Sequence, residues 1–225
     1  MYLTKAALRR DSGPKGSYAA QLLDAAGRDN AHRLVWALFS ETGGEQRDFL
    51  FREVEPGEYI VLSKREPTDA TGLWSLQTRP FEPEFQIGQK LGFLLRANPA
   101  ETAKLAGVKN GRAKRVDAVM NAKRPRAERG NATFDAQEVE EAALNWLVKR
   151  QNRLGVVFDT ARCAVSAYDV LRVPRGRSGE DMRFGVADYE GVMQVQDPAA
   201  LLTAVCGGIG KAKAFGCGLM LVRPV

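Results

Sequence analysis

Histidine and cysteine are both scarce in this 225-residue sequence. His32 is the only histidine, which excludes every mechanism that needs two of them, including paired-histidine ribonuclease chemistry and HExxH metal sites. The three cysteines, Cys163, Cys206 and Cys217, are odd in number and lack CxxC spacing. We therefore expect no disulfide framework, no metal site and no cofactor, and a reducing cytoplasm as the compartment.

Long apolar runs are absent as well. No stretch approaches the roughly 20 apolar residues that a membrane-spanning helix needs. The N-terminal sequence MYLTKAALRRDSG also lacks the apolar centre of a signal peptide. These two features predict a protein without a membrane partner.

The composition is that of an ordinary globular protein, with 44% hydrophobic and 27% charged residues, which argues against disorder and fibrous repeats. The length suffices for one large domain or two small ones. Lysines and arginines number 33 against 27 aspartates and glutamates, so the formal net charge is +6. This excess of positive charge favours an anionic partner.

The first half of the chain is predicted to hold strands around one helix. The N-terminal YLTKAAL is short and partly alternating, which is typical of a strand. A helix is expected from about 30 to 40, where Asp29 or Asn30 can accept the free N–H groups of its first turn. The segments DFLFREV and EYIVLSK flank a Glu-Pro-Gly turn at 55–57 and predict a hairpin. Residues 72–79 fit an edge strand.

The second half repeats this order with clearer signals. Asp135 and Asp197 are expected to cap two helices, and Gly155 is expected to stop the first of them. The predicted elements are a strand at 90–97, a helix over 135–153, β-rich segments at 163–173 and 183–195, a helix at 198–206 and a last strand at 218–222.

Both halves therefore follow the order strand, helix, strand, strand, helix, strand, with a weak signal for the second helix of the first half. This order predicts an α+β fold of two tandem ferredoxin-like βαββαβ domains, a scaffold also used by RRM proteins. We place the boundary in the stretch 80–89. Residues 1–87 then carry the histidine helix, and residues 88–225 carry a basic insertion, an arginine hairpin and a glycine-rich loop.

The glycine-rich sequence GGIGKAKAFGCG at 207–218 does not match a nucleotide-binding motif, because Ala follows Lys211 where a phosphate loop needs Ser or Thr. One interpretation is a permissive turn between a helix and a strand. The other is that glycines let the backbone approach an RNA phosphate closely while lysines add charge. The candidate RNA-binding residues here are Gly208, Gly210, Lys211, Lys213 and Gly216.

His32 falls on the shoulder of the apolar stripe of its predicted helix, near Trp36. It can be a half-buried packing residue. It can also be a general acid or base at a helix N-terminus, where a phosphate would be favoured. Spacing alone leaves both interpretations open.

Two basic regions stand out in the second half. The insertion at 104–129 holds nine Lys or Arg against two Asp or Glu, and its glycines and Pro125 suggest a flexible segment that orders on a polyanion. An exposed, solvated charge run is the alternative for it. Arginines at the tip of the predicted hairpin suit phosphates and guanine edges, with a charged turn as the alternative. The candidates are Lys114 and Arg115 in the insertion and Arg172, Arg175 and Arg177 in the hairpin.

Four sequence segments together resemble the CasE family, the CRISPR repeat-RNA endoribonucleases of the type I-E Cascade complex. They are the opening MYLTK, the helix NAHRLVWALF, FLLRANP at 93–99 and GGIGKAKAFGCGLM near the C-terminus. The resemblance covers nearly the whole chain in order. The glycine loop and LRANP are specific in combination, whereas each alone would be weak.

The resemblance implies two ferredoxin-like domains that bind the hairpin of the CRISPR repeat and cut at its 3′ base without a metal. The product would end in a 2′,3′-cyclic phosphate, and the protein would stay on the guide RNA as a Cascade subunit. The family's catalytic histidine matches His32. Members often carry a tyrosine three residues earlier, where this sequence has Asp29, and Tyr18 lies too far upstream to take that place.

The main hypothesis is therefore a metal-independent endoribonuclease for CRISPR repeat RNA. His32 would move a proton at the reacting oxygens, and Arg33, Lys211 and Lys213 are the candidate cations for the phosphate. A non-catalytic guide-RNA-binding subunit is the alternative, since Asp29 replaces the tyrosine. A structural protein with a basic surface and no RNA partner is a third hypothesis.

Overall fold

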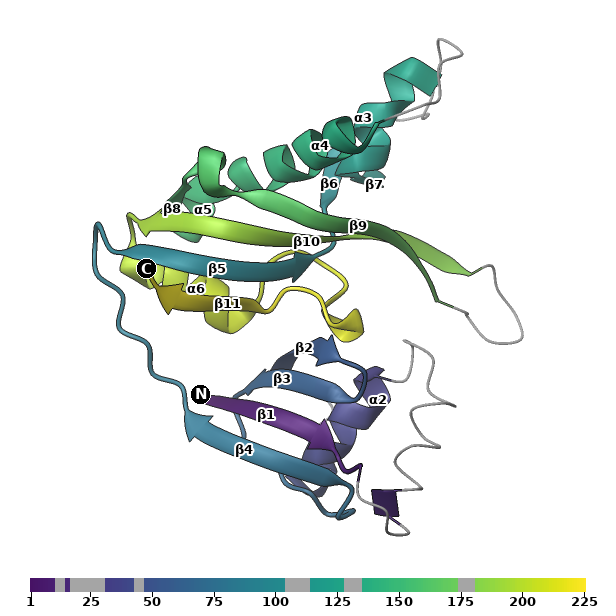
Figure 1. Cartoon of the computed structure of the whole chain (residues 1–225), viewed down its shortest axis with the longest axis vertical. Coiled ribbons are helices and arrows are strands. Elements are labelled where there is room, and N and C mark those ends of the chain that lie inside the picture. The colour runs from purple at the N-terminus through teal and green to yellow at the C-terminus, as the bar shows by residue number, and fades with distance from the viewer. Residues whose placement is uncertain (11–14, 17–30, 43–46, 104–113, 128–134, 174–180) are drawn as a thin grey trace. The chain divides into compact units, whose positions relative to one another are not determined.

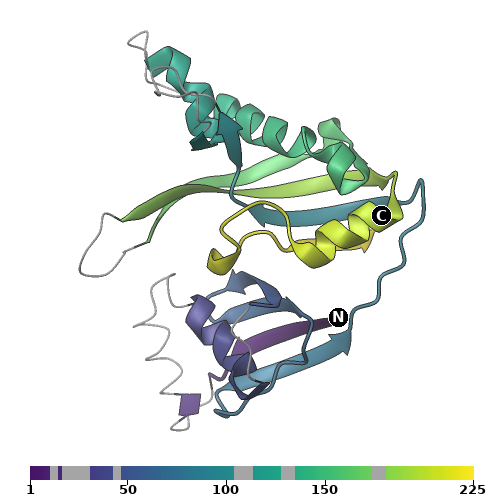
Figure 2. The same cartoon turned by 180° about the vertical axis from the view of Figure 1, so that it is seen from behind.

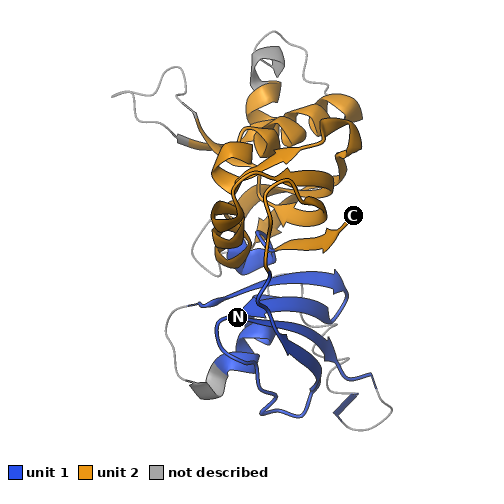
Figure 3. Ribbon diagram, turned by 90° about the vertical axis from the view of Figure 1, so that its left-hand side faces the viewer, with its two compact units in different colours: residues 1–83, 212–219 blue, residues 84–211, 220–225 orange. Residues whose placement is uncertain are grey.

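A computed structural model shows two compact units (Figures 1 and 3). Unit 1 comprises Met1–Pro83 and Ala212–Leu219, and unit 2 comprises Glu84–Lys211 and Met220–Val225. The sequence-based division at residue 87 differs from this by four residues and by the segment 212–219. The structure describes residues 1–10, 15–16, 31–42, 47–103, 114–127, 135–173 and 181–225.

Unit 1 is built on a four-stranded antiparallel sheet in the order β2-β3-β1-β4, which is the ferredoxin-like order. Helix α2 covers one face of this sheet (Figures 1 and 2). The elements are β1 (Tyr2–Leu8), α2 (Ala31–Trp36), the 3₁₀ helix η2 (Ala37–Thr42), β2 (Phe49–Glu55), β3 (Glu58–Ser63), β4 (Trp74–Pro80) and the 3₁₀ helix η6 (Lys213–Phe215).

The core of unit 1 follows from the alternation of side chains along its strands. On β1, Ala6 and Leu8 are buried, whereas Lys5 is exposed. On β2, Phe49 and Phe51 are buried in the same cluster as the apolar side chains of α2. The predicted strands and the hairpin at 55–57 are confirmed.

The connection between β3 and β4 contains no helix, since residues 64–73 are all described and none is helical. Asp69 organises this connection. One of its oxygens accepts three backbone N–H groups and the other accepts the N–H of Trp74 at 2.9 Å. Thr68 N donates to the carbonyl of Leu38 at 2.9 Å. Unit 1 therefore lacks the weakly signalled second helix, because a short loop held by one carboxylate closes the gap between the two strands.

Unit 2 also has the ferredoxin-like order, β11-β5-β10-β8, with β9 paired to the long strand β10. All of these pairs are antiparallel. The elements are β5 (Lys90–Ala97), β6 (Ala100–Ala103), β7 (Lys114–Asp117), α3 (Ala118–Ala127), α4 (Ala136–Val148), α5 (Gln151–Leu154), β8 (Val156–Phe158), the 3₁₀ helix η4 (Thr160–Arg162), β9 (Ala164–Val173), β10 (Met182–Val195), α6 (Pro198–Gly207) and β11 (Met220–Pro224).

The outer helix ends of unit 2 are where the sequence predicts them, but the one helix expected over 135–153 is interrupted at 149–150 and forms α4 and α5. Asp135 accepts the N–H of Glu138 at 2.8 Å, and the Glu138 carboxylate accepts the N–H of Asp135 at 3.2 Å, which completes a capping box. Asp197 caps α6 by accepting two backbone N–H groups at 3.0 Å. Gly155 ends the helical region in the left-handed conformation, with φ of 68°. Local capping chemistry therefore accounts for these boundaries.

Strands β9 and β10 form a hairpin that extends past the neighbouring strands of the sheet (Figures 1 and 2). Pairing runs from Glu190↔Ala164 out to Met182↔Val173, whereas β5 pairs with β10 only over 187–194. The two predicted β-rich segments are confirmed. The extension carries the hairpin beyond the body of the sheet, as the arginine-tip hypothesis requires.

The basic insertion is more ordered than its composition suggests. Residues 114–127 form β7 and α3, and β7 pairs with β6. Asp117 begins α3 by accepting the N–H of Val119 at 2.9 Å, and the Tyr168 hydroxyl donates to the same oxygen at 2.9 Å. The expectation of a flexible segment is wrong over this part, because a carboxylate anchors the insertion to β9. Residues 104–113 and 128–129 lie outside the described residues.

Candidate active site

His32 is the second residue of α2, and its ring packs among aromatic side chains of unit 1. Its ring centroid lies 5.4 Å from that of Trp36, 6.2 Å from that of Phe49 and 6.4 Å from that of Phe51. The side chain is half-buried. The aromatic rings fix the position of the imidazole while part of it stays exposed, so the packing role and a chemical role are compatible.

The surroundings of His32 favour its neutral form. Burial lowers the pKa of His32 below its ordinary value, and the nearby Arg47 guanidinium lowers it further. At neutral pH the imidazole therefore carries one proton and one free nitrogen lone pair. A neutral imidazole can accept a proton from a hydroxyl group, as a general base must.

The N-terminus of α2 contributes little to the site by itself. The α-helical part has only six residues and continues as a 3₁₀ helix, so the dipole that the sequence hypothesis invoked is small. Asp29 and Asn30, the expected caps, lie outside the described residues. Cationic side chains can supply the positive charge for an anion here.

One cationic side chain of the first half acts on this imidazole, and a second follows it in the sequence. Arg33 is the next residue on α2 and is exposed. Arg47, just before β2, is half-buried and acts electrostatically on His32. Arg47 was not among the residues predicted from the sequence. Its position two residues before Phe49 could have indicated it, because side chains two residues apart in a strand point to the same side.

The second half of the glycine-rich loop belongs to the same unit as His32. Residues 212–219 are part of unit 1, and η6 contacts both α2 and β2. Gly216 has a φ of 77°, and a Cβ there would lie 3.5 Å from the ring of Phe51. Glycine therefore suits both this backbone conformation and this close packing. Lys213, at the start of η6, is brought to the unit that holds His32.

The first half of the loop belongs to unit 2 and has structural roles there. Gly208 is the C-cap of α6, and its N–H donates to Ala204 O at 2.9 Å. A Cβ on Gly210 would lie 3.3 Å from the carbonyl oxygen of Asn98. Lys211 forms a β-bridge with Asn98 and is exposed. The turn interpretation therefore describes these glycines, and RNA contacts by Gly208, Gly210 and Lys211 stay a prediction.

Arg172 and Arg115, two of the predicted RNA-binding arginines of unit 2, lie exposed on strands. Arg172 of β9 pairs in register with Arg183 of β10, and both are exposed, so two cations stand side by side near the hairpin tip. Arg183 is a second residue that the sequence analysis missed. Arg115 is exposed on β7, one residue after Lys114. Arg175 and Arg177 lie outside the described residues, as does Tyr18.

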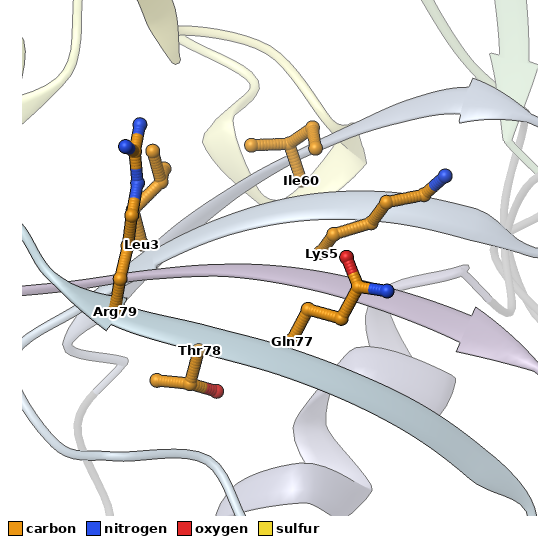
Figure 4. A pocket seen from close by; sticks show the side chains of 6 residues that line it. All are labelled: Leu3, Lys5, Ile60, Gln77, Thr78 and Arg79. Atoms are coloured by element: carbon orange, nitrogen blue, oxygen red, sulfur yellow. The ribbon is translucent and has the colours of Figure 1, made fainter.

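A shallow pocket of about 330 Å³ lies on the side of the unit 1 sheet away from its aromatic core. Figure 4 shows Lys5, Ile60 and Arg79 projecting to one side of the sheet and Thr78 to the other. Thr78 shares a hydrogen bond of 3.0 Å with the buried Thr4. Because His32 packs on the core side, against Phe49 and Phe51, this pocket is separate from the candidate site.

Neither a metal-binding group nor a membrane helix is evident in the part of the chain that the structure describes. Within it, no three His, Cys, Asp or Glu side chains gather as a metal-binding group. None of the helices there has the length and apolar character needed to cross a membrane.

Comparisons with known proteins match the whole chain. A family model described as "CRISPR associated protein" matches residues 1–224. The Cascade subunit CasE of the CRISPR system of Escherichia coli is 31% identical over 201 residues, covering 86% of this chain and 90% of the relative. The CRISPR-associated endoribonuclease Cse3 of Thermus thermophilus is 28% identical, and the match covers 100% of both proteins.

Solved structures share the fold. The CRISPR endoribonuclease Cse3 bound to a 19-nucleotide RNA is similar with a TM-score of 0.70 and 26% identity, over 99% of both chains. Thermus thermophilus Cse3 bound to an RNA representing a pre-cleavage complex has a TM-score of 0.68 and 26% identity, covering 99% of this chain and 98% of the other. The α+β fold expected from the sequence is thus confirmed along the chain.

Proposed function

The chain belongs to the CasE family of CRISPR-associated proteins, and we propose that it is an endoribonuclease for CRISPR repeat RNA. It binds the hairpin of the repeat and cuts the strand at the 3′ base of that hairpin. The observation that carries this proposal is the half-buried His32 whose pKa is lowered by burial and Arg47, on a helix that resembles the one holding the family's catalytic histidine. RNA-bound Cse3 structures, which are similar over nearly the whole chain, support RNA as the substrate.

The reaction is an internal transesterification. The 2′-oxygen attacks the adjacent phosphorus, the new P–O bond forms, and the bond from phosphorus to the 5′-oxygen of the next nucleotide breaks. The 2′-hydroxyl loses its proton, and the leaving 5′-oxygen gains one. The products are a strand ending in a 2′,3′-cyclic phosphate and a strand beginning with a 5′-hydroxyl. Atoms balance without water or a cofactor.

His32 accepts the proton from the 2′-hydroxyl in this proposal, because burial and Arg47 keep its imidazole neutral. Such proton transfer typically contributes ~10²–10⁴-fold to the rate. One imidazole serves only one of the two proton transfers in a step, so another donor protonates the 5′-oxygen. Holding the two reacting oxygens in line with the phosphorus supplies much of the remaining acceleration.

We further propose that cleavage needs no metal ion, because the neutral imidazole and the cationic side chains can supply a base and charge stabilisation. Cleavage is therefore expected to continue at an unchanged rate in excess EDTA. The measurement is the single-turnover rate of cleavage of the repeat RNA with EDTA and with added Mg²⁺ or Mn²⁺. Loss of cleavage in EDTA and recovery with a divalent ion would contradict this mechanism.

After cleavage the protein stays on the guide RNA and assembles with other Cascade subunits. The similarity to the Cascade subunit CasE supports this assignment. We place the activity in the cytoplasm, since the three cysteines are free thiols and fit a reducing compartment.

Incubation of the purified protein with its CRISPR repeat RNA tests the proposal. The expected result is tight binding followed by cleavage at the 3′ base of the hairpin. Binding without cleavage would instead identify a non-catalytic guide-RNA-binding subunit, the alternative favoured by Asp29 in place of the family tyrosine. Absence of both would leave only a structural role for the basic surface.

A further inference from the structure

Arg47 lies on the side of β2 that faces His32. The antiparallel ladder between β2 and β3 continues before β2, because Lys64 N donates to Asp48 O at 3.2 Å. Alternation along this extended segment puts the side chain of Arg47 on the same side as that of Phe49. The Phe49 ring is stacked on His32 with centroids 6.2 Å apart. Arg47 is also close enough to repel the protonated form of His32.

Arg47 is a half-buried cation that no described carboxylate neutralises. The adjacent Asp48 is engaged elsewhere, because both of its oxygens accept hydrogen bonds from Arg65 at 2.7 and 2.9 Å. Burial lowers the pKa of Arg47, and no attractive partner among the described residues offsets this effect. A partly buried charge without a counterion is unfavourable unless an anion completes the site. Partly buried ionisable groups with shifted pKa values cluster at functional sites.

From this arrangement we infer that Arg47 is a catalytic residue that binds the scissile phosphate of the RNA and holds it beside His32. The inference rests on the proposed function and names the group that completes its site. An arginine can donate two parallel N–H groups to two oxygens of one phosphate. In the transition state the same donors stabilise the extra negative charge on the phosphorane oxygens.

Arg47 then has two effects on one step. It places the phosphorus next to the 2′-oxygen whose proton His32 removes. It also disfavours the imidazolium form of His32 before the substrate binds, so that the base is free at neutral pH. Arg33 also carries a positive charge, but it is exposed and does not contribute to the lowered pKa of His32. Arg47 is half-buried and does contribute to it.

Binding of two product-like RNAs tests this inference without requiring cleavage. Both are the repeat hairpin cut at the cleavage position, one ending in a 3′-hydroxyl and the other in a 3′-phosphate. The unmodified protein should bind the phosphate-ended RNA roughly 10- to 100-fold more tightly, as expected for charge-assisted hydrogen bonds. Arg47→Ala and Arg47→Gln should lose most of this gain and bind the 3′-hydroxyl RNA with unchanged affinity.

Arg79→Ala is the matched control. Arg79 is an exposed arginine of the same unit on β4, at the edge of the sheet opposite β2. This variant should prefer the phosphate-ended RNA over the 3′-hydroxyl RNA as strongly as the unmodified protein does. In single-turnover cleavage, Arg47→Gln should be slower by roughly 10²-fold or more, the usual effect of removing one donor to a transition-state oxyanion.

Several results would overturn the inference. The unmodified protein and Arg47→Gln could show the same preference for the 3′-phosphate RNA over the 3′-hydroxyl RNA. Arg47 would then not bind the phosphate, even if the unmodified protein cuts RNA. The same conclusion follows if the unmodified protein binds the 3′-phosphate RNA no more tightly than the 3′-hydroxyl RNA. Arg47→Gln keeps a polar side chain and removes the charge, so it gives the answer if Arg47→Ala does not fold. Failure of the unmodified protein to bind the hairpin would instead reject the proposed function, and this inference with it.

Discussion

Units 1 and 2 have the same strand order and differ in what is attached to it. Unit 1 has a short sheet and one short helix, and its histidine sits where that helix meets β2. Unit 2 has two well-capped helices, a basic insertion anchored through Asp117, and a hairpin that extends past its sheet. The shared order sets a common scaffold, and the attached elements decide which unit does what.

From this difference we propose that unit 1 carries the chemistry and unit 2 the recognition. A general base needs a fixed, partly desolvated position, which the ring cluster around His32 provides. Recognition of an RNA stem needs cations that project into solvent, and Arg172 and Arg183 meet that need on the hairpin. Three predictions test this division.

The largest expected effect is on catalysis by unit 1. His32→Ala should lower the single-turnover rate by ~10²–10⁴-fold, because the base that takes the 2′-hydroxyl proton is lost. Affinity should stay within about twofold, measured on a repeat RNA with a 2′-deoxy sugar at the cleavage position, which cannot react. Equal losses of rate, affinity and thermal stability would mean that His32 acts only in packing.

A smaller effect is expected on recognition by unit 2. Arg175→Ala combined with Arg177→Ala should reduce discrimination between the cognate hairpin and a stem-scrambled RNA, since each lost guanine contact costs ~1–3 kcal/mol. Neutralising Lys114, Arg115, Lys123 and Arg124 in the insertion should instead weaken the binding of both RNAs alike. That change should also reduce the slope of log affinity against log salt concentration by about one for each lost phosphate contact.

The two variants serve as controls for each other. Affinities for both RNAs, measured at two salt concentrations, separate sequence recognition from general attraction to phosphates. If the insertion variant is the one that loses discrimination, the assignment of the two basic regions is reversed. If neither variant changes either affinity, unit 2 does not hold the recognition surface.

The smallest expected effect is a shift in pH dependence. With His32 as the base, cleavage should rise with pH and level off at an apparent pKa below the ordinary 6.5, because burial and Arg47 disfavour the protonated ring. The other charged groups on the elements around His32 are Arg33 on α2, Glu41 on η2, Arg52, Glu53 and Glu55 on β2, and Lys213 on η6. Single-turnover rates between pH 5 and 8 check this expectation. A midpoint above 6.5, or a rate that falls with rising pH, contradicts it.

The same depressed pKa has a consequence for stability. Below the ordinary pKa the unfolded chain binds a proton at His32 more readily than the folded chain does. The contribution of His32 to folding is thus fully present above pH 6.5 and is lost as the pH falls through the folded-state pKa. In His32→Ala this part of the acid dependence should vanish, as thermal unfolding at several pH values would show.

Elements governed by nearby residues were predictable from the sequence. The capping box at Asp135, the Asp197-Pro198 helix start and the 55–57 turn each depend on groups within a few positions of one another. The β9–β10 hairpin was also predictable, since its two segments adjoin in the chain. Composition misled in the insertion, because the Tyr168–Asp117 hydrogen bond that orders it spans 51 residues.

The candidate site was likewise predictable only in the part that depends on nearby residues. The sequence by itself determined that one histidine, on a helix beside aromatic residues, is available for acid–base chemistry, and its resemblance to a known family singled that residue out. Only the tertiary structure decided that Arg47 acts on it, that η6 with Lys213 joins its unit, and that burial and Arg47 lower the pKa of its imidazole. The physical reason is that desolvation and Coulombic repulsion depend on distance in space. Strand pairing and packing set those distances between residues that the chain itself keeps apart.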